Sequence, residues 1–189
     1  MKHFRISKGL TLLELLIVLG IVAIIFTLAS PAFVQMVQTA RQKSALGELI
    51  SLINLARNTA IQEQVTVTLC PLFNNQICAS DWSKPLVAFR DPGRTKTAST
   101  QSQILRILQL NDSGQLTGKT GIRNYFRFRP SGFAEEAIGN IVWCPKDGDI
   151  RHASQIRINM GGRPFISKDS DHDGIAEDAY GQPLQCSSS

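Results

Sequence analysis

Leu10-Thr11-Leu12-Leu13-Glu14-Leu15-Leu16-Ile17-Val18-Leu19-Gly20-Ile21-Val22-Ala23-Ile24-Ile25-Phe26-Thr27-Leu28-Ala29 is the stretch that decides the fold. Its 20 residues form about 30 Å of helix, which is enough to cross a bilayer. Glu14 carries the one charge in the stretch, at a cost of about 2.5–3.5 kcal/mol or more on membrane-insertion scales. A charge kept at that cost indicates that Glu14 has a function and a partner.

Two ordinary explanations of an apolar N-terminal segment fit only in part. Lys2, Arg5 and Lys8 match the basic start of a secretory signal peptide. However, Glu14 interrupts the apolar region, and Pro31 directly follows the nearest small residues, which disfavours cleavage there. A plain membrane anchor explains the length and the basic flank, but it leaves Glu14 unexplained.

A third explanation is a family resemblance. The run Gly9-Leu10-Thr11-Leu12-Leu13-Glu14-Leu15 resembles the class III signal of type IV pilins and type II secretion pseudopilins. The resemblance implies that a prepilin peptidase cuts after Gly9, that the new amino group of Leu10 is N-methylated, and that Glu14 is the fifth mature residue. Residues 1–9 are then a leader peptide.

The physical chemistry of Glu14 agrees with that resemblance. A new amino group on Leu10 is a cation, and Glu14 lies about one helical turn further along the same side. In stacked subunits, Glu14 of one chain can pair with the Leu10 amine of its neighbour, which offsets both desolvation costs. We therefore expect Glu14 to set the register of subunits in a filament.

Composition bounds the rest of the chain. The 189 residues suffice for one globular domain and an extension, and the formal net charge is +5. Lys2, Arg5 and Lys8 supply three of the 20 basic residues, which leaves 17 basic against 15 acidic residues. The remainder is mildly basic, so charge alone does not indicate nucleic-acid binding.

Cys70, Cys78, Cys144 and Cys186 are an even number of cysteines in a chain whose bulk we expect to be exported. Disulfides are the natural interpretation. Cys70 with Cys78 is the local choice, and Cys144 with Cys186 then ties the C-terminal tail to the core, although the sequence alone leaves the connectivity open. A zinc site is the rival, but the chain has no C-x-x-C pair.

The helix is expected to continue beyond the apolar stretch to about Gln64, with a kink at Pro31. Residues 10–30 form its transmembrane or filament-core half, and residues 31–64 form an amphipathic half. The apolar residues of the second half recur three and four positions apart, which places them on one stripe. They are Leu46, Leu49, Ile50, Ile53, Ala56 and Ala60.

From Val65 the pattern changes to the alternation of short strands. We expect strands at 65–69, 86–90, 104–110, 125–129, 138–143, 155–159 and 163–167. Cys70-Pro71 is expected to end the first strand, and Asp91-Pro92-Gly93 is a turn signal. Short strands with frequent turns indicate a sandwich or packed antiparallel sheets. The predicted fold is α+β, with one long, partly transmembrane N-terminal helix packed on a C-terminal antiparallel β-domain, residues 65–189, in the pilin-like manner.

Four further segments resemble landmarks of the GspH/FimT-type minor pilins. They are Leu55-Ala56-Arg57-Asn58-Thr59-Ala60-Ile61, Val67-Thr68-Leu69-Cys70-Pro71, Phe128-Arg129-Pro130-Ser131-Gly132 and Gly161-Gly162-Arg163. The resemblance implies a low-copy subunit near a filament tip that helps start assembly, with the inner membrane, prepilin peptidase and other pilins as partners and a periplasmic β-domain. A type IV pilus and a type II secretion pseudopilus share all of these motifs.

Catalysis is not expected, and no cofactor is required. His152 and His172 stand in polar segments with no serine or cysteine nucleophile beside them. The structural role of a filament subunit therefore remains the leading interpretation.

An acidic motif near the C-terminus predicts a calcium site. The run Asp169-Ser170-Asp171-His172-Asp173-Gly174 places three carboxylates at alternate positions before a glycine, as calcium loops do. The Ile175 carbonyl, Glu177 and Asp178 are the further candidate ligands. The bidentate glutamate of an EF-hand is missing, because Tyr180 stands at its position. The alternative is a solvated acidic turn.

A nucleic-acid-binding pilin for DNA uptake in natural transformation is the alternative function. Some FimT-like pilins use a G-R-x-R motif, of which Gly162 and Arg163 match while Phe165 replaces the second arginine. Arg163, Arg157, Arg127 and Arg129 are the candidate phosphate contacts. The competing interpretation, which we favour, is that these arginines solubilise the outer faces of strands.

Overall fold

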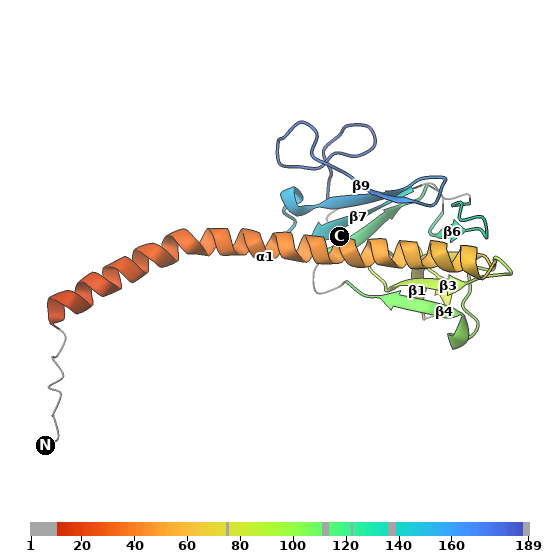
Figure 1. Ribbon diagram of the computed structural model, residues 1–189, viewed down its shortest axis with the longest axis horizontal. Coiled ribbons are helices and arrows are strands. Elements are labelled where there is room, and N and C mark those ends of the chain that lie inside the picture. Colours follow the sequence, from red (N-terminus) through yellow and green to blue (C-terminus); the bar gives the residue numbers. More distant parts are fainter. Residues whose placement is uncertain (1–10, 75, 111–113, 122, 136–138, 187–189) are drawn as a thin grey trace, which may run out of the picture. The chain divides into compact units, whose positions relative to one another are not determined.

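The computed structural model describes residues 11–74, 76–110, 114–121, 123–135 and 139–186. It divides into two compact units, residues 1–38 and residues 39–189. One helix, α1 (Leu12–Gln62), contributes to both units (Figure 1). The predicted helix over residues 10–64 agrees with α1 to within two residues at each end.

The first unit consists of the N-terminal part of α1. Thr11 precedes the helix, and its hydroxyl Oγ1 accepts a hydrogen bond from the backbone N–H of Glu14 at 3.2 Å. This is the bond of a helix N-cap, so the threonine of the pilin-like signal begins the helix. The large apolar side chains from Leu12 to Phe26 are 40–78% exposed in the isolated chain.

The second unit combines the remainder of α1 with two antiparallel sheets. The first sheet has the order β2 (Ile77–Cys78), β1 (Val67–Phe73), β3 (Leu86–Arg90), β4 (Ile104–Leu108), and β6 (Phe126–Phe128) also pairs with β1. The second sheet has the order β5 (Gly114–Lys119), β7 (Gly139–Pro145), β8 (Ser154–Ile158), β9 (Pro164–Ile166). Short 3-10 turns, Gln101–Gln103 and Ile150–His152, precede β4 and β8.

The core lies between α1 and both sheets. Figure 1 shows β7 and β9 to one side of the helix and β1, β3 and β4 to the other. The helix contributes a buried stripe of Ala45, Leu46, Leu49, Leu52, Ile53, Ala56 and Ala60. The sheets contribute Val67, Leu69, Phe126, Phe128, Ile141, Trp143, Ile156 and Ile158. The predicted stripe is therefore confirmed, with Ile50 half-buried at its margin and two further residues added.

The prediction that Cys70-Pro71 ends the first strand is wrong. Strand β1 continues to Phe73, and Pro71 stands opposite Leu86 of β3. Proline has no N–H to donate, but its carbonyl accepts a hydrogen bond from the N–H of Ala79 at 2.7 Å. The N–H of Leu72 then donates to the carbonyl of Pro85 at 3.1 Å, so the pairing resumes beyond the proline.

Strand β5 was not predicted. It pairs with β7 along its whole length, from Gly114 opposite Pro145 to Lys119 opposite Asn140. Because β5 contains two glycines, its sequence is typical of a loop rather than a strand. One of these glycines has a packing role. A Cβ atom at Gly118 would overlap the Trp82 indole, so the missing side chain makes room for the tryptophan.

Both expected disulfides are present. Cys70 on β1 is bonded to Cys78 on β2, and Cys144 on β7 is bonded to Cys186. The second bond joins residues 42 apart in sequence and fixes the C-terminal segment to the second sheet. Leu184 packs beside it on Val142 and Ala153.

Candidate functional site

The apolar part of α1 is the first candidate site. Among the described residues, α1 is the one helix long and apolar enough to cross a membrane, judged by length and composition. The described residues contain no salt bridge to the exposed Glu14, which stands in the first turn of the helix. The proposed cleavage residues Gly9 and Leu10 lie outside the described residues.

Arg57 on α1 joins three of the sequence landmarks. Its Nε donates hydrogen bonds to the carbonyl oxygens of Gly132 and Gly161, both at 3.1 Å. Gly132 follows β6 of the first sheet, whereas Gly161 lies between β8 and β9 of the second. One guanidinium therefore ties the helix to a turn of each sheet. The landmarks that contain these residues therefore have a structural role, which the sequence pattern alone did not reveal.

Gly132 and Gly162 make that junction possible. Both have a positive φ, +79° and +71°, which favours glycine. A Cβ atom on Gly162 would overlap the Gly132 carbonyl oxygen and would lie 3.2 Å from Cδ of Arg57. The two turns can therefore approach each other only because residue 162 has no side chain.

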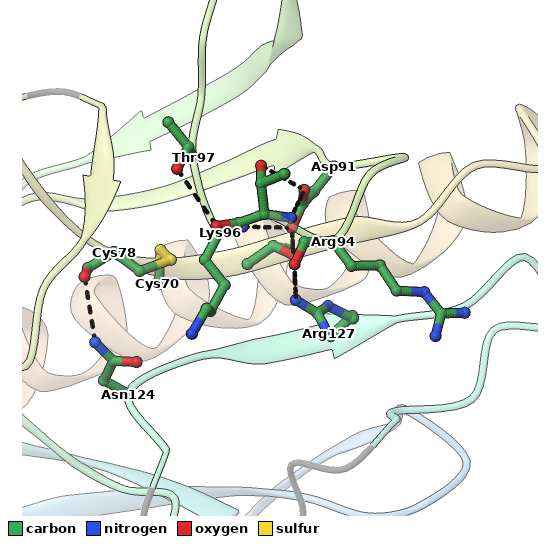
Figure 2. Close-up of a disulfide and its surroundings, with 10 residues drawn as sticks. Cys70, Cys78, Asp91, Arg94, Lys96, Thr97, Asn124 and Arg127 are labelled. Atoms are coloured by element: carbon green, nitrogen blue, oxygen red, sulfur yellow. Dashed lines mark hydrogen bonds and ion pairs between the residues drawn. A yellow bond between two sulfur atoms is a disulfide. The ribbon is translucent and has the colours of Figure 1, made fainter.

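A buried polar network stands beside the first disulfide (Figure 2). Asp91 is 1% exposed and accepts hydrogen bonds from the Thr68 hydroxyl at 2.8 Å and from the backbone N–H groups of Thr95 and Lys96 at 2.8 and 3.1 Å. Its carboxylate also lies 3.6 Å from Nη2 of Arg127. The predicted turn at Asp91 is present, and its carboxylate organises the loop that follows.

Arg127 is therefore wrongly assigned as a phosphate contact. It is 5% exposed, forms the ion pair with Asp91, and donates from Nη2 to the carbonyl of Arg94 at 3.1 Å. Its guanidinium also lies 4.8 Å from the centre of the Tyr125 ring. Figure 2 shows Arg127 pointing toward Asp91 and Arg94. Its guanidinium therefore has its partners inside the protein and does not face solvent.

The other candidate phosphate contacts do not form one basic face with it. Arg129 is ion-paired with Glu135, and Arg94 lies 3.3 Å from the same carboxylate. Arg157, half-buried on β8, and the exposed Arg163, in the turn before β9, belong to the second sheet. The four predicted arginines thus divide between two sheets.

A small, partly exposed ion-pair cluster follows β7. Arg151 donates from Nη2 to Oδ2 of Asp149 at 2.8 Å and from Nε to Oδ1 at 2.9 Å. These side-chain hydrogen bonds are the main reason that the pKa of Asp149 falls to about 2. His152 Nδ1 lies 3.3 Å from the same carboxylate.

The acidic loop brings four of its predicted residues together. Oxygen atoms of Asp169, Asp171, Asp173 and Glu177 all lie within 4.8 Å of one another. Asp178 is outside this group, and its Oδ1 accepts hydrogen bonds from the N–H groups of Tyr180 and Gln182 at 2.8 and 3.1 Å. Those bonds lower the pKa of Asp178.

Comparison with known proteins identifies the family. Residues 45–162, more than half of the chain, match the family described as type II transport protein GspH, and residues 4–30 match the prokaryotic N-terminal methylation motif. The chain belongs to the GspH family. It is therefore a minor pilin or pseudopilin of that family, as its signal and landmarks had indicated. The family consists of structural pilin subunits that assemble with other pilins.

One solved structure shares the fold of this chain. The type IV minor pilin FimU of Pseudomonas aeruginosa matches with 18% identity over 77% of this chain and 94% of that chain, at a TM-score of 0.50. A second crystal form of FimU matches with 17% identity over 67% and 92% of the two chains, at a TM-score of 0.49. At 18% identity, the first match shows a shared fold: a long helix with antiparallel sheets.

A search of the curated proteins finds no match to this chain. Nothing in these comparisons supports the DNA-binding alternative. The N-terminal apolar helix and the GspH-family domain together indicate a membrane-anchored pilin with a soluble C-terminal domain.

Proposed function

We propose that this GspH-family chain is a low-abundance subunit that starts assembly of a type IV pilus or a type II secretion pseudopilus. It is made as a prepilin, cut between Gly9 and Leu10 by a prepilin peptidase, and methylated on the new Leu10 amine. Before assembly, residues 10–30 hold it in the inner membrane with the β-domain in the periplasm.

One observation carries the proposal. A methylation motif over residues 4–30 and a GspH domain over residues 45–162 occur in this order in one chain. The apolar first part of α1 supports it, because side chains exposed on the isolated helix need lipid or other helices around them.

Glu14 gives the assembly step its chemistry. The Thr11 hydroxyl holds the N–H of Glu14 at the start of the helix, so the carboxylate occupies the first turn. A carboxylate in an apolar environment is stabilised by a cation in contact with it. The methylated amine of Leu10 in the neighbouring subunit is the cation that we assign to it.

The experiment compares three forms of the full chain in a bacterial strain that lacks its own copy. They are the natural chain, Glu14→Ala, and Glu48→Ala as a matched change of a glutamate further along α1. Intact-mass analysis reports cleavage and methylation, and immunoblots of sheared filaments report incorporation.

We expect all three chains to be cut before Leu10, and we expect Glu14→Ala alone to be lost from sheared filaments. The strain without the chain should form few filaments. Normal filament numbers without the chain would refute the initiating role, and normal incorporation of Glu14→Ala would refute the role of the carboxylate.

A further inference from the structure

The acidic loop after β9 has the geometry of a cation-binding turn. Asp169 lies at its start, and its Oδ1 and Oδ2 accept hydrogen bonds from the N–H groups of His172 and Gly174 at 2.7 and 2.9 Å. His172 and Gly174 have positive φ values of +67° and +90°. The chain therefore curls around the first aspartate, and the oxygens of Asp171 and Asp173 lie within 4.8 Å of those of Asp169.

Glu177 provides a second, independent observation at this loop. It is 8% exposed, in contrast to the exposed aspartates. Its Oε2 accepts a hydrogen bond from the N–H of Ser170 at 2.8 Å. Its Oε1 is buried and has no hydrogen-bond partner among the described residues. A buried carboxylate oxygen without a partner is costly, and here the carboxylate faces three further carboxylates.

No side-chain cation of the described residues lies within ion-pairing distance of these carboxylates, although Arg157 and Lys168 line the same pocket as Asp171 and Glu177. None of the salt bridges found in the described part of the chain includes Asp169, Asp171, Asp173 or Glu177. Four like charges within 4.8 Å repel one another strongly when one of them is buried. A bound cation removes the repulsion and also supplies the partner that Oε1 lacks.

We propose that Asp169, Asp171, Asp173 and Glu177 bind one calcium ion. The four side chains offer only oxygen atoms, which suit a hard cation, whereas zinc prefers nitrogen and sulfur. Calcium accepts six to eight oxygens in a flexible loop, whereas magnesium requires a near-ideal octahedron and keeps several waters. The sequence spacing adds the Ile175 carbonyl as a further ligand.

The ion would join two segments of the C-terminal region. Asp169 to Asp173 form the exposed curl, whereas Glu177 is held on the domain by its N–H, which donates to the Lys168 carbonyl at 3.2 Å. Ala176, the residue before Glu177, accepts a hydrogen bond at its carbonyl from the N–H of Leu184 at 3.0 Å, next to the Cys144–Cys186 disulfide. Calcium therefore fastens the curl to a disulfide-anchored base. This role is independent of the proposed assembly function.

The test uses the full chain, purified in detergent micelles, stripped with a chelator and dialysed. Isothermal titration with CaCl2, and separately with MgCl2, measures the affinity and the number of ions bound. Thermal melting with and without calcium measures the effect on stability. Glu177→Gln and Asp171→Asn each remove a proposed ligand charge, and Asp178→Asn removes a neighbouring charge that we place outside the site.

We expect one calcium ion per chain with a Kd of about 10⁻⁴–10⁻³ M, as in extracellular calcium modules, and weaker magnesium binding. The melting temperature should rise by about 3–6 °C at ten times the Kd. Glu177→Gln and Asp171→Asn should each weaken binding by about tenfold or more. Asp178→Asn should change it by less than about threefold, because its charge acts only through screened electrostatics.

Two results would overturn the proposal. One is the absence of binding heat and of a melting shift up to about 10 mM calcium, well above the affinity range of such sites. The other is calcium binding that Asp171→Asn and Glu177→Gln leave unchanged. Since Glu177 is buried, the circular dichroism spectrum of Glu177→Gln is first compared with that of the unchanged chain to establish that the variant folds. If it does not fold, the exposed Asp171→Asn variant decides.

Discussion

Replacing Gly162 with alanine tests the close approach of the two turns that meet at Arg57. The new Cβ would overlap the Gly132 carbonyl oxygen and would press on the Arg57 side chain, whose Nε lies 3.3 Å from its position. Neither neighbour can yield freely, because the carbonyl belongs to the backbone and Arg57 holds two hydrogen bonds at 3.1 Å. The substitution must therefore separate the turns or break those bonds.

The magnitude follows from two contributions. An alanine at the φ of +71° costs about 1–2 kcal/mol in backbone strain. Loss of a hydrogen bond from a charged donor costs about 1.5–3 kcal/mol. Together they lower the free energy of unfolding by about 2.5–5 kcal/mol, a large share of the stability of an ordinary domain. For a domain of this size, the melting temperature should fall by about 5–20 °C.

Gly148→Ala is the matched control. Gly148 has nearly the same φ, +73°, but no atom lies within 4 Å of the position its Cβ would take. This variant should therefore show the backbone strain alone, about 1–2 kcal/mol. Both variants are unfolded by heat and by urea in detergent micelles, with the disulfides intact. If Gly162→Ala loses no more stability than Gly148→Ala, the argument from close approach is wrong.

Two further predictions concern charged groups. Asp91→Ala leaves the buried Arg127 without its carboxylate partner, so urea unfolding should show that the free energy of unfolding falls by about 3–5 kcal/mol. The double variant Asp91→Ala/Arg127→Leu should lose less stability than the sum of the two single variants. Strictly additive losses would contradict the coupling. The pKa of Asp149 is lowered to about 2, so its ion pair stabilises the fold fully above pH 4 and loses that effect as the pH falls toward 2. Melting temperatures of the natural chain and Asp149→Asn should therefore converge at low pH, and a constant difference from pH 7 to pH 2 would count against the assignment.

Much of the fold could be predicted from local patterns. The helix period repeats every three or four residues, so the buried stripe from Leu46 to Ala60 is visible in the sequence. The strand at Phe126–Phe128 was found in the same way, because its two phenylalanines alternate with Arg127. Both patterns depend only on neighbours in the chain.

Long-range contacts explain what could not be predicted. Alternation correctly places Arg127 on the face opposite the core phenylalanines, but the loop that begins at Asp91 covers that face, so the arginine is buried. Arg57 binds carbonyl oxygens that are 75 and 104 residues away, and no local pattern encodes them. The sequence around Gly118 is typical of a loop. The reason for a glycine in this strand is the Trp82 ring, which occupies the space of a side chain at position 118 and is distant in the sequence.

The acidic loop combines both situations. The sequence spacing alone predicted that Asp169, Asp171 and Asp173 form one cluster, because the three aspartates occupy alternate positions before Gly174. The burial of Glu177 and its unpartnered Oε1 depend on the packing of the C-terminal segment, so they appear only in three dimensions.

The exposed side chains from Leu12 to Phe26 bear on how subunits exchange between lipid and filament. Both surroundings are apolar, so moving this part of α1 from one to the other gains little from the release of water. Packing between helices and a few polar contacts must then decide in which of the two a subunit resides. A small free-energy difference between lipid and filament makes the transfer of a subunit reversible. Net growth of a filament then requires an external source of energy.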